Sequence, residues 1–171
     1  MKQIDYNAIF EKQSDRNLTL KEQTNLKKIL GKKISEQYWH IMQNYAGIYL
    51  KEEICFKSIE KSHLTSINGY DRINRFLDYD SILKTAEIYK RQIPKGYIAI
   101  AEKDGGNFLC INKKTGYIYI WVHDAPEGED VFLVNKSLEE FMESLECVDQ
   151  KEKAKSKVVR CNFSSDFFDR L

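Results

Sequence analysis

Three short apolar runs separated by tight turns constrain the fold of this chain more than any other feature. The runs are residues 97–101, 108–111 and 117–122, and they are rich in the β-branched and aromatic residues that strands favour. The turn at 103–107 reads Lys-Asp-Gly-Gly-Asn, and Asp-Gly is a strong hairpin signal because a type I′ turn needs positive φ at both central positions. A second turn follows at 112–116. Because both connections are short, the sequence predicts an antiparallel meander.

Further strands are expected on both sides of this meander. Residues 131–134 (Val-Phe-Leu-Val) form an apolar run after it, and residues 53–56 and 72–77 have strand character before it. Strands and helices occupy separate blocks of the sequence rather than alternating. The pattern therefore favours an α+β fold, in which an antiparallel meander sheet packs against several helices.

Capping residues and apolar spacing predict the helices. Thr19 and Glu22 form a capping-box pattern, in which a hydroxyl and a carboxylate three residues apart satisfy each other's backbone amides. Pro94 blocks the continuation of a helix that follows Asp80. We expect helices from Thr19 to about Leu30 with Gly31 as the stop, from Ser35 to Ala46-Gly47, from Asp80 to Ile93, and from Ser137, with a short helix within 4–13.

The length of 171 residues fits one domain, which we place at residues 1–147. Residues 148–171 form a C-terminal extension. Its apolar side chains are too numerous for a free end, so we expect it to dock on the domain, with partner binding as the alternative. These side chains are Phe163, Phe167, Phe168 and Leu171.

Composition excludes several classes of protein. The formal net charge is +1, which removes the bulk electrostatic argument for direct nucleic-acid binding. The four cysteines form no CxxC pair, so a zinc ribbon or thioredoxin-like motif has no basis. The N-terminal residues do not resemble a signal peptide, and no apolar run approaches the ~20 residues that span a membrane. We therefore expect a cytoplasmic protein with reduced thiols and no membrane association.

Motifs for catalysis and metal binding are missing from the sequence. None of the three histidines has a partner at metal-ligand spacing, and no phosphate loop or nucleophile elbow occurs. The most notable candidate is His123, which follows a strand and could in principle act on Cys110. We expect no catalytic residues, no metal, no cofactor and no enzymatic activity, and an enzyme that uses His123 or a cysteine is the third-ranked alternative.

Charge is distributed unevenly along the chain. Residues 124–150 contain nine acidic residues and one basic residue, a net charge of −8, and residues 151–160 carry a net charge of +4. Two uses are open. The basic run could fold back on the acidic helix, or the acidic segment could face a basic partner.

Several motifs together resemble the SUKH superfamily. Residues 93–101 and 104–111 match its pattern of an apolar strand, a Gly-Gly-Asn turn and a second apolar strand. Residues 120–123 (Ile-Trp-Val-His) match the following strand, which carries a Trp and a His. After an acidic loop, residues 137–141 (Ser-Leu-Glu-Glu-Phe) match the start of the terminal helix.

The resemblance covers residues 18–147 and implies a SUKH-like α+β domain. It departs from the family upstream, where Ile34-Ser35 and Ala46-Gly47 stand in place of Leu-Pro and Asn-Gly-Gly. Members include a yeast cell-wall-synthesis regulator (Smi/Knr) and bacterial immunity proteins that neutralise a cognate polymorphic toxin by direct binding. The resemblance thus implies an immunity protein, with a non-catalytic intracellular regulatory or scaffold protein as the alternative.

An immunity protein needs a surface that fits its toxin. Many nuclease toxins are basic because they grip phosphates, so an acidic surface would suit such a partner. We expect the loop after Trp121 to supply that surface, although a merely solvated loop is the alternative. The predicted partner-binding residues are Trp121, His123, Asp124, Glu127, Glu129 and Asp130.

Overall fold

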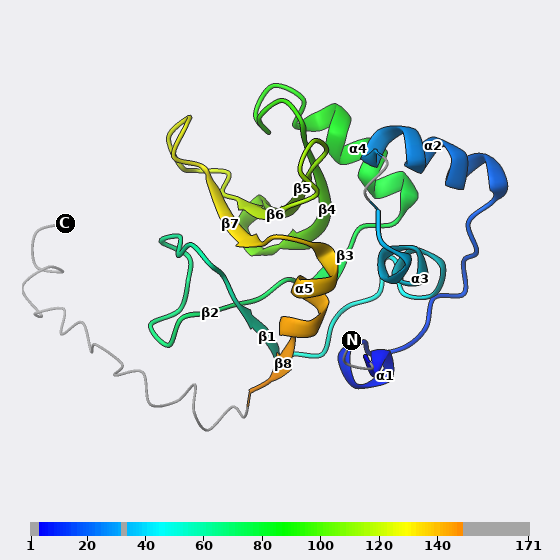
Figure 1. Ribbon diagram of the computed structural model, residues 1–171, viewed down its shortest axis with the longest axis horizontal. Helices are drawn as coiled ribbons and strands as arrows, with labels where there is room; N and C mark the ends of the chain where they lie inside the picture. The colour runs from blue at the N-terminus through cyan, green and yellow to red at the C-terminus, as the bar shows by residue number, and fades with distance from the viewer. Residues whose placement is uncertain (1–3, 32–33, 149–171) are drawn as a thin grey trace, which may run out of the picture.

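The predicted meander is the centre of the fold. The structure is a computed structural model that describes residues 4–31 and 34–148. Its main sheet has five antiparallel strands in the order β3-β4-β5-β6-β7, so the four strands from β4 onward follow one another as predicted (Figure 1). The α+β class is confirmed. The strands are β3 (Arg75–Phe76), β4 (Tyr97–Lys103), β5 (Asn107–Asn112), β6 (Ile118–Trp121) and β7 (Val131–Asn135).

A second, smaller sheet lies beside the first, in the order β2-β1-β8. Its strands are β1 (Ile54–Lys57), β2 (Tyr70–Asp71) and β8 (Glu146–Cys147). The expected strand at 72–77 is wrong as a single element. The chain leaves the small sheet at Asp71 and joins the large one at Arg75, because Asn74 between them donates its backbone N–H to Glu102 on β4 at 2.7 Å.

The helices are α1 (Tyr6–Ile9), α2 (Leu20–Leu30), α3 (Glu36–Asn44), α4 (Tyr79–Ile88) and α5 (Leu138–Ser144). The predicted N-caps Thr19, Ser35 and Ser137 are confirmed. The start of α4 was predicted two residues too late. Its N-cap is Asp78, whose carboxylate accepts from the backbone N–H of Ser81 at 2.8 Å. None of the helices in the described ranges has the length and apolar character needed to cross a bilayer.

The turn between β4 and β5 differs from the expected two-residue type I′ turn. Lys103 pairs with Asn107, which leaves the three-residue connection Asp104–Gly106. Gly105 and Gly106 both have φ of 76°. The left-handed conformation therefore falls on the two glycines rather than on Asp104 and Gly105, since only glycine adopts it without steric cost.

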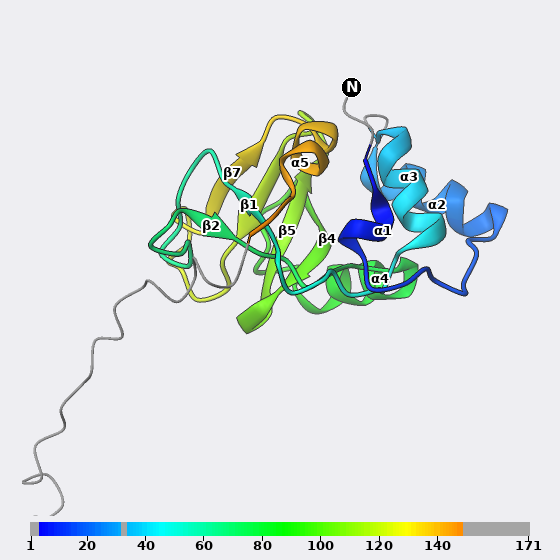
Figure 2. The same cartoon turned by 90° about the horizontal axis from the view of Figure 1, so that it is seen from below.

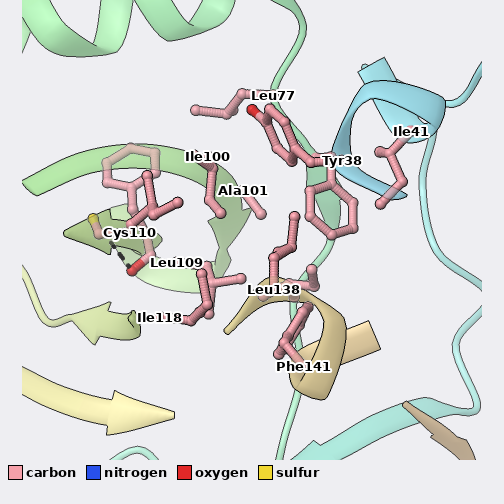
Figure 3. Packing of buried hydrophobic residues seen from close by; sticks show 14 of the residues in the cluster. Tyr38, Ile41, Leu77, Ile100, Ala101, Leu109, Cys110, Ile118, Leu138 and Phe141 are labelled. Carbon is pink, nitrogen blue, oxygen red and sulfur yellow. Dashed lines mark hydrogen bonds between the residues drawn. The ribbon is translucent and has the colours of Figure 1, made fainter. Parts of the chain in front are cut away.

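The core lies between one face of the main sheet and helices α3 and α5. Figure 3 shows Tyr38 of α3 and Leu138 and Phe141 of α5 facing sheet residues that include Ile100 and Leu109. The Phe141 ring also contacts Phe56 of β1 edge-on, with centroids 5.0 Å apart. Burial of such side chains contributes about 1.5–3 kcal/mol each. The same aromatic residue thus joins both sheets to one core.

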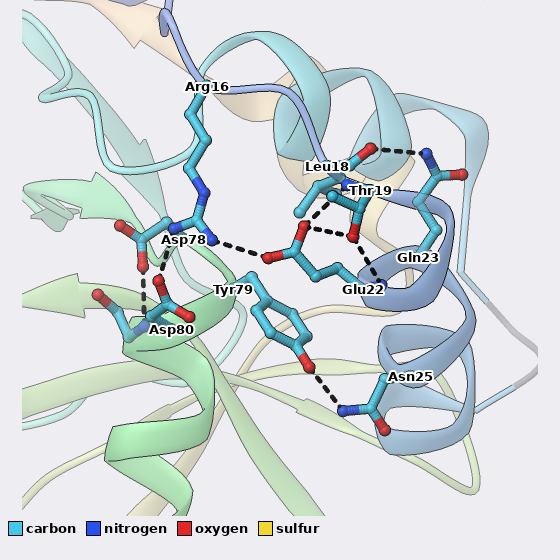
Figure 4. Close-up of polar contacts among 10 residues, drawn as sticks. Arg16, Leu18, Thr19, Glu22, Gln23, Asn25, Asp78, Tyr79 and Asp80 are labelled. Atoms are coloured by element: carbon cyan, nitrogen blue, oxygen red, sulfur yellow. Dashed lines mark hydrogen bonds and ion pairs between the residues drawn. The ribbon is translucent and has the colours of Figure 1, made fainter.

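Polar contacts attach the N-terminal segment to α4 (Figure 4). Arg16 lies 2.7 Å from Asp80 and 2.8 Å from Glu22, so one guanidinium bridges the first turns of α4 and α2. Figure 4 also shows the Asn25 side chain donating to the Tyr79 hydroxyl at 2.8 Å. This contact holds the start of α4 against α2, which explains why the helix begins at Tyr79 rather than later.

The segment between β1 and β2 covers the outer edge of β7. Ile59 and Glu60 donate backbone N–H groups to Val134 at 3.1 Å and to Leu133 at 2.8 Å. The Glu60 carboxylate in turn accepts from the backbone N–H of Leu133 at 2.7 Å. We call residues 58–69 the β1–β2 loop. Figure 2 shows it on the side of the molecule opposite α2.

The cysteines in the described part of the chain differ in exposure. Cys55 and Cys110 are buried and Cys147 is exposed. The single domain at 1–147 stays a prediction. The predicted docking of the C-terminal extension, like Cys161 within it, lies outside the described residues.

Candidate functional site

The loop between β6 and β7, residues 122–130, is closed at its base by Trp121 and Asp130. The indole N–H of Trp121 donates to the Asp130 carboxylate at 2.8 Å, and the backbone N–H of Val122 donates to the Asp130 carbonyl at 2.8 Å. Trp121 is 2% exposed and Asp130 5% exposed. Both ends of the loop are therefore fixed to the sheet, and we call this segment the β6–β7 loop.

The interior of the β6–β7 loop has turns of its own. Ala125 donates its backbone N–H to Val122 at 3.3 Å, and Glu129 donates to Pro126 at 3.0 Å across Gly128, whose φ is 88°. Two successive turns thus shape the loop between its fixed ends. Between those ends, the charged side chains of Asp124, Glu127 and Glu129 are exposed.

Asn107 ties the β6–β7 loop to the Gly-Gly turn. Its carboxamide donates to the carbonyl of Asp104 and accepts from the backbone N–H of His123 at 2.9 Å. Asn107 is 6% exposed, and both of these bonds are partly buried. The Gly-Gly-Asn motif therefore serves a structural purpose here: it fixes the first residues of the loop that follows β6.

An aromatic cluster packs against the start of the β6–β7 loop. Tyr89, just after α4, packs edge-on against Phe108, Trp121 and His123 at centroid distances of 5.1, 5.6 and 6.0 Å. Such edge-to-face pairs contribute about 0.5–1.5 kcal/mol beyond the area that they bury. The cluster links α4, β5 and the start of the β6–β7 loop.

A groove of about 680 Å³ runs between the β6–β7 loop and the connection from α4 to β4. Lys90, Arg91 and Lys95 line one side, and Glu127 lines the other. Lys90 is 3.0 Å from Glu87, so its charge is partly balanced, and the described residues offer Arg91 and Lys95 no ion-pair partner. We call this the first groove; its two sides have opposite charge.

The structure divides the six predicted partner-binding residues into two groups. Trp121 and Asp130 are buried and hold the loop, so the expected acidic surface loses one of its four carboxylates. The exposed residues are His123, Asp124, Glu127 and Glu129. His123 Nδ1 lies 2.9 Å from the Asp124 carboxylate. Whether these side chains bind a partner stays a prediction.

Arg91 and Lys95 are the residues that sequence reasoning missed. They precede β4, and they are about thirty residues from the acidic loop in the sequence. Their signal is non-local, because the α4–β4 connection comes to lie beside the β6–β7 loop only through the packing of Tyr89, after α4, against Trp121 and His123. The basic side of the first groove could therefore not be found from charge runs.

The alternative of a His123–Cys110 pair has no geometric support. The Cys110 thiol is fully buried, and burial raises its pKa, with the nearby Asp130 carboxylate as a smaller cause. Such a thiol is a poor nucleophile, because the thiolate is the reactive form. No hydrogen bond connects it to His123 in residues 34–148, and no group of three potential metal ligands gathers in the described ranges.

Comparison with known proteins places this arrangement in a family. A similar chain is the "SPbeta prophage-derived uncharacterized protein YokK" of Bacillus subtilis (strain 168), 28% identical over an alignment of 133 residues, with 68% of each chain covered. No solved structure matches significantly. The model of the SMI1 / KNR4 family (SUKH-1) matches residues 17–144, a range that contains the meander, the Gly-Gly-Asn turn and both sides of the first groove. The resemblance seen in the sequence is thereby confirmed, and the chain belongs to the SMI1 / KNR4 family (SUKH-1).

Proposed function

We propose that this protein is an immunity protein, which neutralises a cognate toxin by direct contact and without catalysis. The observation that carries the proposal is the β6–β7 loop, which is fixed at both ends and exposes the carboxylates of Asp124, Glu127 and Glu129. An ordered loop loses little entropy on binding, so more of its contact energy becomes affinity.

The charge of this loop supports a basic partner. Opposite charges across an interface speed encounter and exclude wrong partners. Asp124, Glu127 and Glu129 would face a basic surface, as nuclease-type toxin domains carry to bind phosphates. The prophage origin of the similar B. subtilis protein is compatible with this role, since the family resemblance also implies immunity.

The test is capture followed by protection. Tagged full-length protein is recovered from its native host at moderate salt, and bound proteins are identified by mass spectrometry. The captured partner is then expressed alone and together with this chain. The proposal expects one stoichiometric partner that is toxic alone and harmless when co-expressed. A partner that is not toxic, or toxicity that co-expression leaves unchanged, would contradict it.

A charge reversal tests the surface within the same assay. The variant Glu127→Lys/Glu129→Lys should weaken capture and make the remaining binding less sensitive to salt. The control Glu11→Lys/Asp15→Lys changes the net charge by the same amount at exposed positions in the N-terminal segment. If both variants bound the partner with equal affinity, Glu127 and Glu129 would not belong to the toxin interface. Immunity would then depend on a different surface of the domain.

The second candidate function is a regulatory scaffold. The first groove favours it, because sides of opposite charge suit an extended segment with residues of both signs. Several non-toxic partners in the capture experiment would support this candidate over immunity. A third reading, an enzyme, would require turnover that His123→Ala abolishes with the fold intact.

A further inference from the structure

A second groove lies on the other side of the β6–β7 loop. It has a volume of about 590 Å³ and is bounded by the β1–β2 loop, the β6–β7 loop and β7. The residues that line it are Glu60, His63, Ala125, Pro126, Glu129, Val131 and Phe132. Its surface is thus mainly apolar, with two carboxylates among the lining residues.

Apolar side chains of the groove and its border are accessible. Ile59, which precedes Glu60 of the lining, is 56% exposed, and Pro126 of the lining is exposed as well. Exposed apolar surface that polar residues surround marks interaction sites. The groove therefore fits a segment that has apolar side chains. Because Glu60 and Glu129 line the groove, this segment should also carry positive charge.

The chain itself carries a segment of this chemistry beyond the described residues. Five bases and one acid occupy residues 151–160, and the apolar side chains of Phe163, Phe167, Phe168 and Leu171 follow. The order is a basic run and then aromatic residues. This composition complements the carboxylates and the apolar lining of the second groove.

The end of the described chain allows this segment to reach the groove. Val148 donates its backbone N–H to Glu53 at 2.9 Å, at the beginning of β1. Glu60 lies seven residues further along the chain than Glu53, a separation of at most about 25 Å at ~3.5 Å per residue. Residues 149–171 span roughly 75 Å when extended at ~3.3 Å per residue, so they can turn back and cover this separation.

We propose that the C-terminal segment 151–171 docks in the second groove of its own domain, with its basic run near Glu60 and Glu129 and its aromatic side chains on Pro126 and Phe132. This inference is independent of the proposed function. It has a consequence for it, however, because Glu129 belongs both to the second groove and to the proposed partner surface. The docked segment and a basic partner would compete for that carboxylate.

The test uses the native thiol Cys161 in the full-length chain. Cys147→Ser removes the exposed thiol, and Ala125→Cys places a thiol in the groove. A short bis-maleimide is added to dilute protein without any partner. The control is Leu20→Cys in the same background, since Leu20 is 81% exposed at the start of α2, and α2 lies on the side of the molecule opposite β7 in both Figures 1 and 2.

The proposal expects a severalfold higher yield of the intramolecular product with Ala125→Cys than with Leu20→Cys, as measured by intact mass. Phe167→Ser/Phe168→Ser should reduce that yield towards the control, and Glu60→Gln/Glu129→Gln should lower it in a salt-dependent manner. Equal yields at the two positions would overturn the proposal. So would a product that is mainly dimeric and concentration-dependent, because the segment would then dock on a second copy.

Discussion

Lys103, at the end of β4, lies 3.1 Å from the Asp71 carboxylate of β2, and this ion pair connects the two sheets. The Asp71 side chain has no exposed surface, and it also accepts from the hydroxyls of Ser58 at 3.2 Å and Thr65 at 2.9 Å. One carboxylate therefore fixes the start and the middle of the β1–β2 loop to the main sheet.

We predict that Asp71→Ala destabilises the protein strongly. Removal of one partner from a buried pair leaves the other charge uncompensated, which costs about 3–5 kcal/mol. Chemical denaturation should show this loss in the free energy of unfolding. The matched control is Glu102→Ala, which breaks the half-exposed pair with Arg75 and should cost about 1 kcal/mol or less. A similar loss for both variants would contradict the role assigned to Asp71.

The bond between Trp121 and Asp130 gives a second prediction. Asp130→Ala leaves a buried indole N–H without its acceptor, at a cost of about 1–3 kcal/mol. It should also release the β6–β7 loop, so amide exchange should rise at residues 123–129. Asp124→Ala, an exposed neighbour in the same loop, should change neither quantity appreciably. Unchanged exchange in Asp130→Ala would show that the loop is held by other contacts.

The Gly-Gly turn gives a third prediction. An added Cβ at Gly105 would force a side chain into a left-handed conformation, at a cost of about 1–2 kcal/mol. It would also lie 3.1 Å from the Asn107 carboxamide, so the Asn107 bond to His123 should weaken. We expect Gly105→Ala to lower the thermal midpoint and to increase amide exchange at His123. A midpoint equal to that of the unaltered protein would argue against a strained position.

The capping box predicts a pH dependence. The backbone N–H and hydroxyl of Thr19, with Arg16, hold the pKa of Glu22 below its ordinary value of 4.5. A carboxylate with a lowered folded pKa stabilises the protein above its unfolded pKa, and this contribution is lost as the pH falls through the folded value. The stability difference between the unaltered protein and Glu22→Gln should therefore be full at neutral pH and shrink below about pH 4.5. In a Thr19→Ala background, which lacks the hydroxyl, the pH dependence should be weaker.

Thiol reactivity gives a fifth prediction. Burial raises the pKa of the Cys110 thiol, so it should resist alkylation at neutral pH. Cys147 is exposed and should react before Cys110. Peptide mapping after brief iodoacetamide treatment would separate the two sites, and Cys110 should be modified only when denaturant is present. Rapid modification of Cys110 in the native protein would revive the hypothesis of a reactive thiol.

Local signals predicted most of the secondary structure. Thr19, Ser35 and Ser137 each cap the helix that follows, because the hydroxyl acts on backbone amides only two or three residues away. The start of α4 was missed for a non-local reason. Asp78 and Asp80 are both suitable caps by sequence, and the contact of Tyr79 with Asn25, distant in the chain, favours the earlier one.

The candidate site was predicted less completely, because burial depends on tertiary contacts. Asp130 belongs to an acidic run, and nothing in its local sequence distinguishes it from Glu127 or Glu129. Its burial follows from the register of β6 and β7, which pairs Trp121 with Val131 and so brings the indole next to Asp130. Arg91 and Lys95 were missed for the same reason, since the fold alone places them across from the loop.

Both outer strands of the main sheet have their backbone groups engaged. Ile59 and Glu60 bond along β7, and at the other edge Tyr49 bridges to Arg75 while Leu50 donates to Asn74 at 2.8 Å. These contacts leave the edges of the main sheet unsuited to extension by a partner's strand. Recognition at this sheet would then rest on side chains of the loops, and side chains can change one codon at a time while the strands stay as they are. A chain built in this way can acquire a new partner without acquiring a new fold.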